Sequence, residues 1–279
     1  MLRPALLLAL LLASTLMAAS PNILVHGHRG ARAVRPENTL PAFEYAIKAG
    51  VDVLELDMAV TKDNVVVVSH DAHLTAPVCT GPRDRAAIRD LTLAQVREYD
   101  CGAKQNPQFP KQQIVPGTKM PTLDEVFAMA KSSRVEFNIE TKILPMEPAL
   151  APSPAEFVKL VLAVIRKHDL EKRVILQSFD FRTLHAMKKI APNMRLSALY
   201  SGAPKDFVEI AKEAGAGIVS PVYPLVKPEL VEAAHKAGLQ VVPWTPNRPD
   251  DWQRMVDAKV DAIISDDPAE LIAFLKKAR

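Results

Sequence analysis

The chain has 279 residues, of which 48% are hydrophobic and 24% are charged, and its formal net charge is +3. This balance is that of an ordinary globular protein and excludes a disordered chain. Because the net charge is small and basic residues form no long run, the sequence does not indicate a nucleic-acid-binding protein. Its length suits either two domains or a single α/β barrel, which takes roughly 250 residues.

The first twenty residues differ in composition from the rest. Arg3 precedes an apolar run over residues 4–17, and small residues follow at 18–20. This order is typical of a secretory signal peptide; a membrane anchor is the alternative, but the run is shorter than the roughly 20 residues that span a bilayer. We therefore expect residues 1–20 to be cleaved and residues 21–279 to be exported, to the periplasm or the medium. We expect no other stretch to span a membrane, and no stable membrane insertion.

The chain contains two cysteines, Cys79 and Cys101, in one irregular segment. In an oxidising compartment a single pair of this kind can form a disulfide. Such a bridge would close a loop of about 20 residues and add roughly 3 kcal/mol of stability. Two unpaired thiols are the alternative, and we prefer the bridge.

Past residue 20, short apolar runs alternate with longer helical patterns. The predicted strands are 23–26, 51–56, 134–139, 173–177, 195–199, 217–219, 239–242 and 261–264. The predicted helices are 40–49, 123–130, 154–168, 182–190, 205–214, 228–237, 251–258 and 268–277. Several strands lack alternation, as expected of parallel strands buried on both faces. The predicted N-caps are Asn38, Thr122, Ser153 and Asp180.

Eight strands that alternate with helices predict a (β/α)₈ TIM barrel. The competing fold is an open doubly wound sheet, whose first strand should be followed by a glycine-rich nucleotide loop. Residues 26–31 read HGHRGA and lack that pattern. We therefore prefer the barrel.

One segment interrupts the alternation. Residues 61–64 form a turn after the second strand, and the extended run 65–69 follows too soon for a crossover helix, so it should pair antiparallel as a hairpin. An insertion over about residues 72–121 then shows only a short helical patch near 93–99. Long insertions in compact folds are usually functional, and we expect a small cap that shapes the substrate pocket.

Acidic side chains end the second and third predicted barrel strands. Glu55 and Asp57 share one strand face by their i, i+2 spacing, and Glu140 ends the next strand. Chemistry in a barrel lies at this carboxyl end, where the three carboxylates would repel one another without a cation. Oxygen ligands favour Ca²⁺ or Mg²⁺ over zinc. The alternative is a set of structural ion pairs with Arg29 and Lys142.

Two histidines directly follow apolar strands, His28 before Arg29 and His70 before Asp71. Imidazole titrates near neutral pH, so this pair is suited to act as general base and general acid on opposite sides of a substrate. Arg29 and Lys142 suit the nonbridging oxygens of a phosphate.

Seven short motifs resemble the glycerophosphodiester phosphodiesterase family, in order over about residues 22–275. They are HRGA at 28–31, PENT at 36–39, ELD at 55–57, HD at 70–71, NIETK at 138–142, QSF at 177–179 and VPWT at 242–245. The resemblance implies a TIM barrel with an insertion after the second barrel strand. It also implies one divalent cation, Ca²⁺ or Mg²⁺, and hydrolysis of a small glycerophosphodiester to sn-glycerol 3-phosphate and an alcohol.

By the same resemblance, His28 and His70 are the acid/base pair, and the metal is held by Glu55, Asp57 and Glu140. Arg29 and Lys142 would bind the phosphate. Glu37 would orient Arg29 or a substrate hydroxyl, and Phe179 and Trp244 would wall the substrate pocket. In the family mechanism, a neighbouring substrate hydroxyl attacks first and gives a cyclic phosphate that water then opens.

Two other functions compete with this interpretation. A related barrel phospholipase acting on intact phospho- or sphingolipid would need an apolar rim, which an aromatic content of 5% does not indicate. A non-catalytic exported binding protein has no need of the two histidines and three carboxylates, all of which are present. Head-group preference and oligomeric state have no signal in the sequence.

Overall fold

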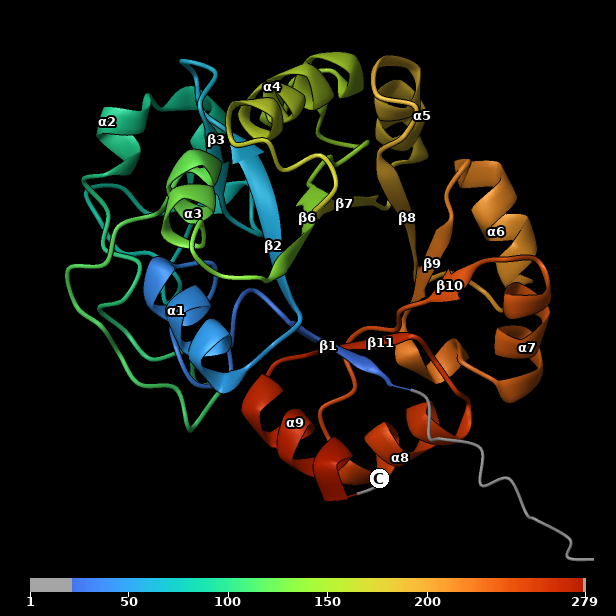
Figure 1. Cartoon of the computed structure of the whole chain (residues 1–279). Coiled ribbons are helices and arrows are strands. Elements are labelled where there is room, and N and C mark those ends of the chain that lie inside the picture. Colours follow the sequence, from blue (N-terminus) through green and yellow to red (C-terminus); the bar gives the residue numbers. More distant parts are fainter. Residues whose placement is uncertain (1–21, 278–279) are drawn as a thin grey trace, which may run out of the picture.

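The structure is a computed structural model that describes residues 22–277 of the chain. Eight strands form a central parallel set and helices surround it, as Figure 1 shows. The strands are β1 (Leu24–Gly27), β2 (Val53–Val60), β6 (Glu136–Thr141), β7 (Val174–Ser178), β8 (Arg195–Tyr200), β9 (Ile218–Pro221), β10 (Gln240–Val241) and β11 (Ala262–Ser265). The predicted signal peptide lies outside the described residues.

The strand order brings the two ends of the sheet together. Along the sheet the order is β10-β9-β8-β7-β6-β2-β1-β11. Trp244, shortly after β10, forms a parallel bridge with Ile264 of β11, and the Asp261 amide donates to the Val241 carbonyl at 3.0 Å. The sheet is therefore a nearly closed parallel barrel, and the predicted TIM-barrel fold is confirmed.

The crossover helices pack on the outside of the strands (Figure 1). They are α1 (Leu40–Ala49), α3 (Leu123–Met129), α4 (Pro154–Lys167), α5 (Phe181–Ile190), α6 (Phe207–Ala214), α7 (Pro228–Lys236), α8 (Pro249–Asp257) and α9 (Pro268–Lys277). Thr122 and Ser153 form capping boxes at α3 and α4, and Asp180 accepts from the Arg182 amide at α5, as predicted. Helix α6 begins two residues later than predicted, because Asp206 is its N-cap.

Asn38 is not a helix cap, so this prediction was wrong. Thr39 occupies the N-cap position of α1, while Asn38 has a φ of 56°. The Asn38 amide donates instead to Asp57 Oδ2 at 2.9 Å, across the carboxyl end of the barrel. Two cap-forming residues stand side by side here, and the structure uses the first of them to hold a carboxylate.

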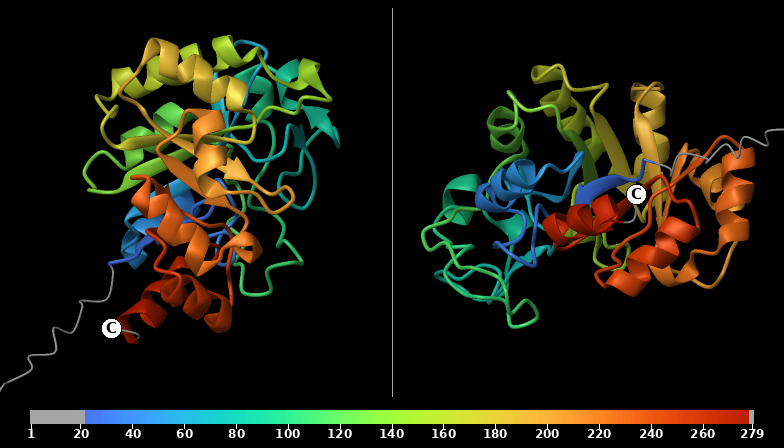
Figure 2. Two further views of the ribbon diagram at one scale, coloured as in Figure 1. Left: turned by 90° about the vertical axis from the view of Figure 1, so that its right-hand side faces the viewer. Right: turned by 60° about the horizontal axis from the view of Figure 1, so that its bottom comes forward.

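The chain between β2 and α3 forms the predicted hairpin and insertion. Strand β3 (Val66–Val68) pairs antiparallel with the end of β2, and β4 (His73–Leu74) pairs antiparallel with β5 (Ala86–Ala87). A short helix, α2 (Leu93–Val96), follows. Cys79 and Cys101 are joined by a disulfide, within a small buried cluster separate from the barrel core. Figure 2 shows the insertion, coloured teal to green, on one side of the barrel.

Among the described residues, one helical stretch is apolar enough, by length and composition alone, to cross a membrane. It is Pro148–Lys167, where the sequence had predicted no such stretch. In the structure it comprises the short turn η2 (Pro148–Leu150) and helix α4, whose buried side chains include Phe157, Val161 and Ile165. Their i, i+4 spacing is that of a helix packed on a core by one face.

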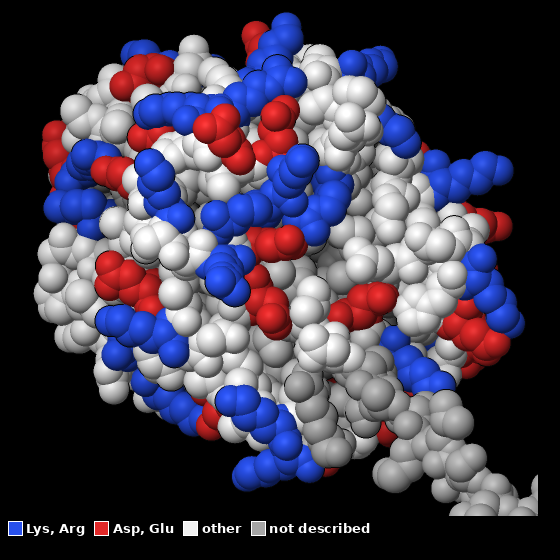
Figure 3. All heavy atoms as spheres, in the orientation of Figure 1, with Lys and Arg blue, Asp and Glu red and all other residues white. Residues whose placement is uncertain are grey.

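Charged side chains of both signs are interspersed on the face of the molecule in Figure 3. Basic groups there stand beside acidic ones, and this face carries no broad field of one sign.

Candidate active site

Barrel register brings the predicted metal ligands together. Strands β2 and β6 are parallel neighbours, and Asp57 stands opposite Glu140 while Glu55 stands opposite Asn138. Because alternate residues of a strand share a face, Glu55, Asp57 and Glu140 all point into the barrel mouth. One oxygen of each carboxylate lies within 4.8 Å of the others, and all three residues are buried.

Each carboxylate is held by a separate polar group. Glu55 accepts from the Arg29 amide and from Gln177 Nε2, both at 2.8 Å. Asp57 accepts from Asn38, and Glu140 lies 2.9 Å from the Lys142 ammonium. The carboxylate oxygens of the cluster are therefore held in fixed positions, from which they could bind a cation.

Burial and mutual repulsion act strongly on these carboxylates. Burial, with the Asp57 charge, raises the pKa of Glu55 well above its usual range. Burial also raises the pKa of Glu140 to about 8, against the charge of Lys142. Although burial opposes it, the charges of His70, Lys142 and Arg29 hold the pKa of Asp57 well below its usual range. A divalent cation would relieve this repulsion, so the buried oxygen cluster fits one.

His28 is held by a carboxylate from the far end of the chain. Its Nδ1 lies 2.5 Å from Asp266 Oδ1, just after β11, and Asp266 also accepts from Arg32 at 2.6 Å and from Asn247 at 2.7 Å. Burial opposes ionisation of Asp266, but His28 and Arg32 lower its pKa, so it is a carboxylate and Nδ1 carries the proton. Burial lowers the pKa of His28 to about 4, against the charge of Asp266. Nε2 is therefore a free acceptor at neutral pH.

His70 follows the hairpin strand β3 and is less buried. Its Nδ1 lies 2.7 Å from the carboxylate of its neighbour Asp71. The hydrogen bond to His70 lowers the pKa of Asp71, so that carboxylate is ionised and orients the ring. Nε2 of His70 is left for the site.

The two predicted phosphate-binding cations line the same cavity as the histidines. Arg29 Nη1 donates to Glu37 at 2.6 Å, and its Nε, 3.4 Å from Asp57, has no hydrogen-bond partner among the described residues. Lys142 lies 3.8 Å from Asp57 as well as beside Glu140. Glu37 is buried and does not line the site cavity, so its position is that of a residue that orients Arg29.

A cavity of about 140 Å³ joins these groups, and two aromatic rings stand at its side. Phe179 and Trp244 meet edge to face with ring centroids 5.5 Å apart, and the Lys142 ammonium lies 6.0 Å from the Phe179 centroid. Trp244 is fixed by its indole N–H, which donates to the Ser220 carbonyl at 3.0 Å. The predicted site residues other than Glu37 therefore line one cavity.

Sequence reasoning missed Asp266, Arg32 and the positioning role of Asn38. Asp266 carried a usable signal, because it directly follows an apolar strand at the carboxyl end of the barrel. A further histidine, His26, is 2% exposed, lies 3.5 Å from Asn138 and does not line the cavity. His26 lies within β1, two residues before His28. Alternate residues of a strand share a face, so its side chain points into the barrel below the mouth.

Comparison with known proteins assigns the family. The chain matches the model of the glycerophosphoryl diester phosphodiesterase family over residues 28–270. The chain belongs to this family. The predicted family is thus confirmed, and with it the prediction that the chain is a phosphodiesterase enzyme.

Individual relatives agree over nearly the whole chain. A glycerophosphodiester phosphodiesterase from Caldanaerobacter subterraneus subsp. tengcongensis is 35% identical over 254 residues, which cover 91% of this chain and 98% of that protein. The crystal structure of a Silicibacter pomeroyi DSS-3 protein that bears the same family name has a TM-score of 0.87 at 31% identity, covering 94% of this chain and 95% of that one.

A more distant phosphodiesterase from Oleispira antarctica was solved in complex with the product sn-glycerol-3-phosphate. Its TM-score is 0.77 at 21% identity, over 91% of this chain and 96% of that one. At this identity the likeness shows the shared fold.

Proposed function

We propose that this phosphodiesterase hydrolyses glycerophosphodiesters to sn-glycerol 3-phosphate and an alcohol, by acid/base catalysis with His28 and His70. The observation that carries the proposal is the buried cluster of Glu55, Asp57 and Glu140, which lines one cavity together with both histidines. The Oleispira antarctica enzyme, with sn-glycerol-3-phosphate bound, supports this choice of product.

The three carboxylates would hold one divalent cation, Ca²⁺ or Mg²⁺, since both prefer oxygen ligands. When bound there, the cation supplies Lewis-acid polarisation of the substrate oxygens. Arg29 and Lys142 would bind the nonbridging phosphate oxygens, where they stabilise the negative charge that develops at phosphorus. Glu37 fixes the guanidinium of Arg29 by their 2.6 Å hydrogen bond.

His28 is suited to the general-base role. Its Nδ1 proton is directed at Asp266 and its Nε2 is unprotonated at neutral pH, so Nε2 can accept the proton of the attacking hydroxyl. In the proposed route that hydroxyl belongs to the glycerol of the substrate, which forms a cyclic phosphate. Phe179 and Trp244 would wall the glycerol on this side of the site.

His70 is suited to the general-acid role. Its ring is oriented by Asp71 through Nδ1, so Nε2 can deliver a proton to the oxygen of the leaving alcohol. When water opens the cyclic phosphate in the second step, the two histidines exchange roles, because the second step reverses the proton transfers of the first.

We also propose that the enzyme acts outside the cytoplasm, in the periplasm or the medium. Two observations support export: the signal-like composition of residues 1–20 and the disulfide between Cys79 and Cys101. Secretion of a reporter fused to residues 1–20 would test it.

One observation favours a second candidate, a phospholipase on intact lipids. Leu144 and Met146, in the loop after β6, are 42% and 92% exposed, and Phe179 is 43% exposed. The low aromatic content had predicted no apolar rim, but these residues expose apolar surface on the loops near the mouth. Intact lipid vesicles therefore belong in the assay.

A coupled assay for sn-glycerol 3-phosphate tests the proposal. Purified enzyme should release it from glycerophosphocholine and related deacylated phospholipids, and a chelator should abolish release until Ca²⁺ or Mg²⁺ is restored. Turnover that survives thorough chelation would exclude the metal role. Cleavage of vesicle lipid without cleavage of any glycerophosphodiester would establish the second candidate instead.

A further inference from the structure

A second cavity, of about 300 Å³, opens beside the site between the insertion and the loop that follows β6. It shares two residues, His70 and Lys142, with the smaller cavity around the carboxylates. A phosphodiester held at Lys142 therefore has two directions in which to extend, one toward Phe179 and Trp244 and the other past His70. The mechanism proposed above assigns no part of the substrate to the space past His70.

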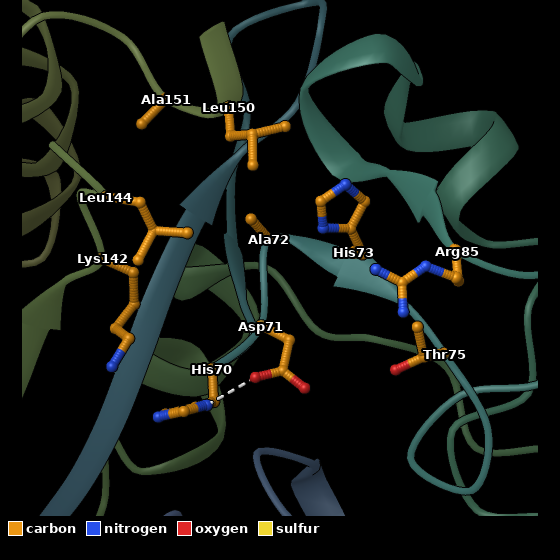
Figure 4. A pocket seen from close by; sticks show the side chains of 10 residues that line it. All are labelled: His70, Asp71, Ala72, His73, Thr75, Arg85, Lys142, Leu144, Leu150 and Ala151. Atoms are coloured by element: carbon orange, nitrogen blue, oxygen red, sulfur yellow. Dashed lines mark hydrogen bonds and ion pairs between the residues drawn. The ribbon is translucent and has the colours of Figure 1, made fainter. Parts of the chain in front are cut away.

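The walls of this second cavity differ in polarity. In Figure 4, His73, Thr75 and Arg85 stand on the insertion side, and Leu144 and Leu150 stand opposite them. Contact between β4 and β5 explains the polar wall: Leu74 pairs with Ala86, and continuing this antiparallel register puts Thr75 beside Arg85.

Backbone contacts also fix the polar wall. The Cys79 amide donates to the Thr75 carbonyl at 2.9 Å, and Cys79 is held in turn by its disulfide to Cys101. The insertion therefore presents these side chains on an anchored scaffold.

Three polar side chains of this wall have no interaction partner among the described residues. Among residues 22–277, the side chains of His73, Thr75 and Arg85 form no hydrogen bond or ion pair. Asp71, the one acidic residue among the described residues that line the cavity, is turned toward His70, as the dashed line in Figure 4 shows. Arg85 thus offers an unpaired guanidinium, a group that matches a carboxylate or a phosphate in two-point geometry.

A quaternary ammonium group would be recognised by different side chains. Such groups bind over aromatic rings, and no aromatic ring of Phe, Tyr or Trp lines this cavity within the described part of the chain. The charge and lining of the cavity therefore favour an anionic occupant over a cationic one.

We propose that the second cavity holds the leaving alcohol, and that Arg85 selects alcohols that carry a carboxylate or a phosphate. The proposal rests on the proposed function, since it names the substrate class for the same site. It also agrees with the placement of His70 at the junction of the two cavities, where the oxygen of the leaving alcohol would lie.

Two matched substrate pairs test the selection. Glycerophosphoserine differs from glycerophosphoethanolamine by one carboxylate, and glycerophosphoglycerol phosphate differs from glycerophosphoglycerol by one phosphate. We expect kcat/KM to favour the anionic member of at least one pair by about tenfold or more, the usual value of a charged hydrogen bond. Arg85→Gln should remove that preference and leave the partner substrate within about twofold, while Arg85→Lys should restore part of it.

Arg83→Gln is the matched control, because Arg83 lies in the same exposed segment and does not line the cavity. It should keep the wild-type preference. Equal turnover within both pairs, or an equal loss on all substrates in Arg85→Gln, overturns the selection while leaving the proposed function intact. Failure to release sn-glycerol 3-phosphate from any of the four substrates overturns both.

Discussion

His28 and His70 line the same cavity but lie in two different environments. The His28 side chain is 10% exposed and is held by Asp266, whereas the His70 side chain is 33% exposed and is held by its own neighbour, Asp71. One imidazole belongs to the barrel core and the other to the hairpin that leads into the insertion. Burial lowers the pKa of the His28 ring, which suits that ring to act as a base.

In the proposed mechanism this difference separates two tasks. The barrel side, with the Asp266–His28 pair, would carry the attack on phosphorus. The insertion side, with His70 and the second cavity, would receive the leaving alcohol. Changes on the barrel side should therefore alter the rate with all substrates alike, and changes on the insertion side should depend on the leaving group.

The largest effect is expected from the three carboxylates that line the cavity with both histidines. Glu140→Gln should lower kcat/KM about a hundredfold or more on every substrate, because even partners outside the first coordination sphere are worth 10–100-fold. Calorimetric titration should show weakened divalent-cation binding. Glu136→Gln is the matched control, since Glu136 lies on the same strand and pairs with Arg195. Full activity in Glu140→Gln would contradict the metal assignment.

A smaller effect, with a defined sign, is expected from Asp266→Asn. The Asp266 charge raises the pKa of His28 against the larger effect of burial, so its removal lowers that pKa further. A base works only when unprotonated, so the acidic limb of the kcat/KM profile should move to lower pH while kcat falls about tenfold or more from lost orientation.

Asp71→Asn provides the comparison on the other side of the site. It should lower kcat by a smaller factor and leave the acidic limb in place, because Asp71 contacts His70 and not His28. An acidic limb that moves in Asp71→Asn and stays fixed in Asp266→Asn would reverse the assignment of the two histidines.

The last prediction concerns cation affinity as a function of pH. The pKa of Glu140 is about 8 and that of Glu55 is raised, so below pH 8 the cation must displace protons. Affinity for Ca²⁺ should rise by about tenfold per pH unit for each proton released between pH 6 and 8. Titrations in buffers of different ionisation enthalpy should show proton release. Affinity independent of pH over this range would show that the carboxylates are already ionised.

The sequence allowed the barrel and most of the site to be predicted, because both depend on local patterns. Strands buried on both faces are apolar throughout, and the polar residues at their ends lie at one edge of the barrel by geometry alone. The sequence alone therefore places His28, Glu55, Asp57 and Glu140 together.

What could not be predicted depends on contacts between distant parts of the chain. Asp266 reaches His28 across 238 positions, only because the last strand closes against the first. Asn38 could have capped helix α1 or bound a side chain elsewhere. It binds the Asp57 carboxylate, which is distant in sequence. The free guanidinium of Arg85 depends on the pairing of two-residue strands, which no sequence pattern reveals.

The most direct test of the division between base and acid uses a leaving group that needs no proton. A glycerophosphodiester of p-nitrophenol, with its acidic leaving group, should be hydrolysed by His70→Ala at a rate within about tenfold of wild type, whereas glycerophosphoethanolamine should lose about a hundredfold or more. His28→Ala should lose activity on both substrates. Equal losses on the two substrates in His70→Ala, or recovery of His28→Ala with p-nitrophenol, would contradict the account.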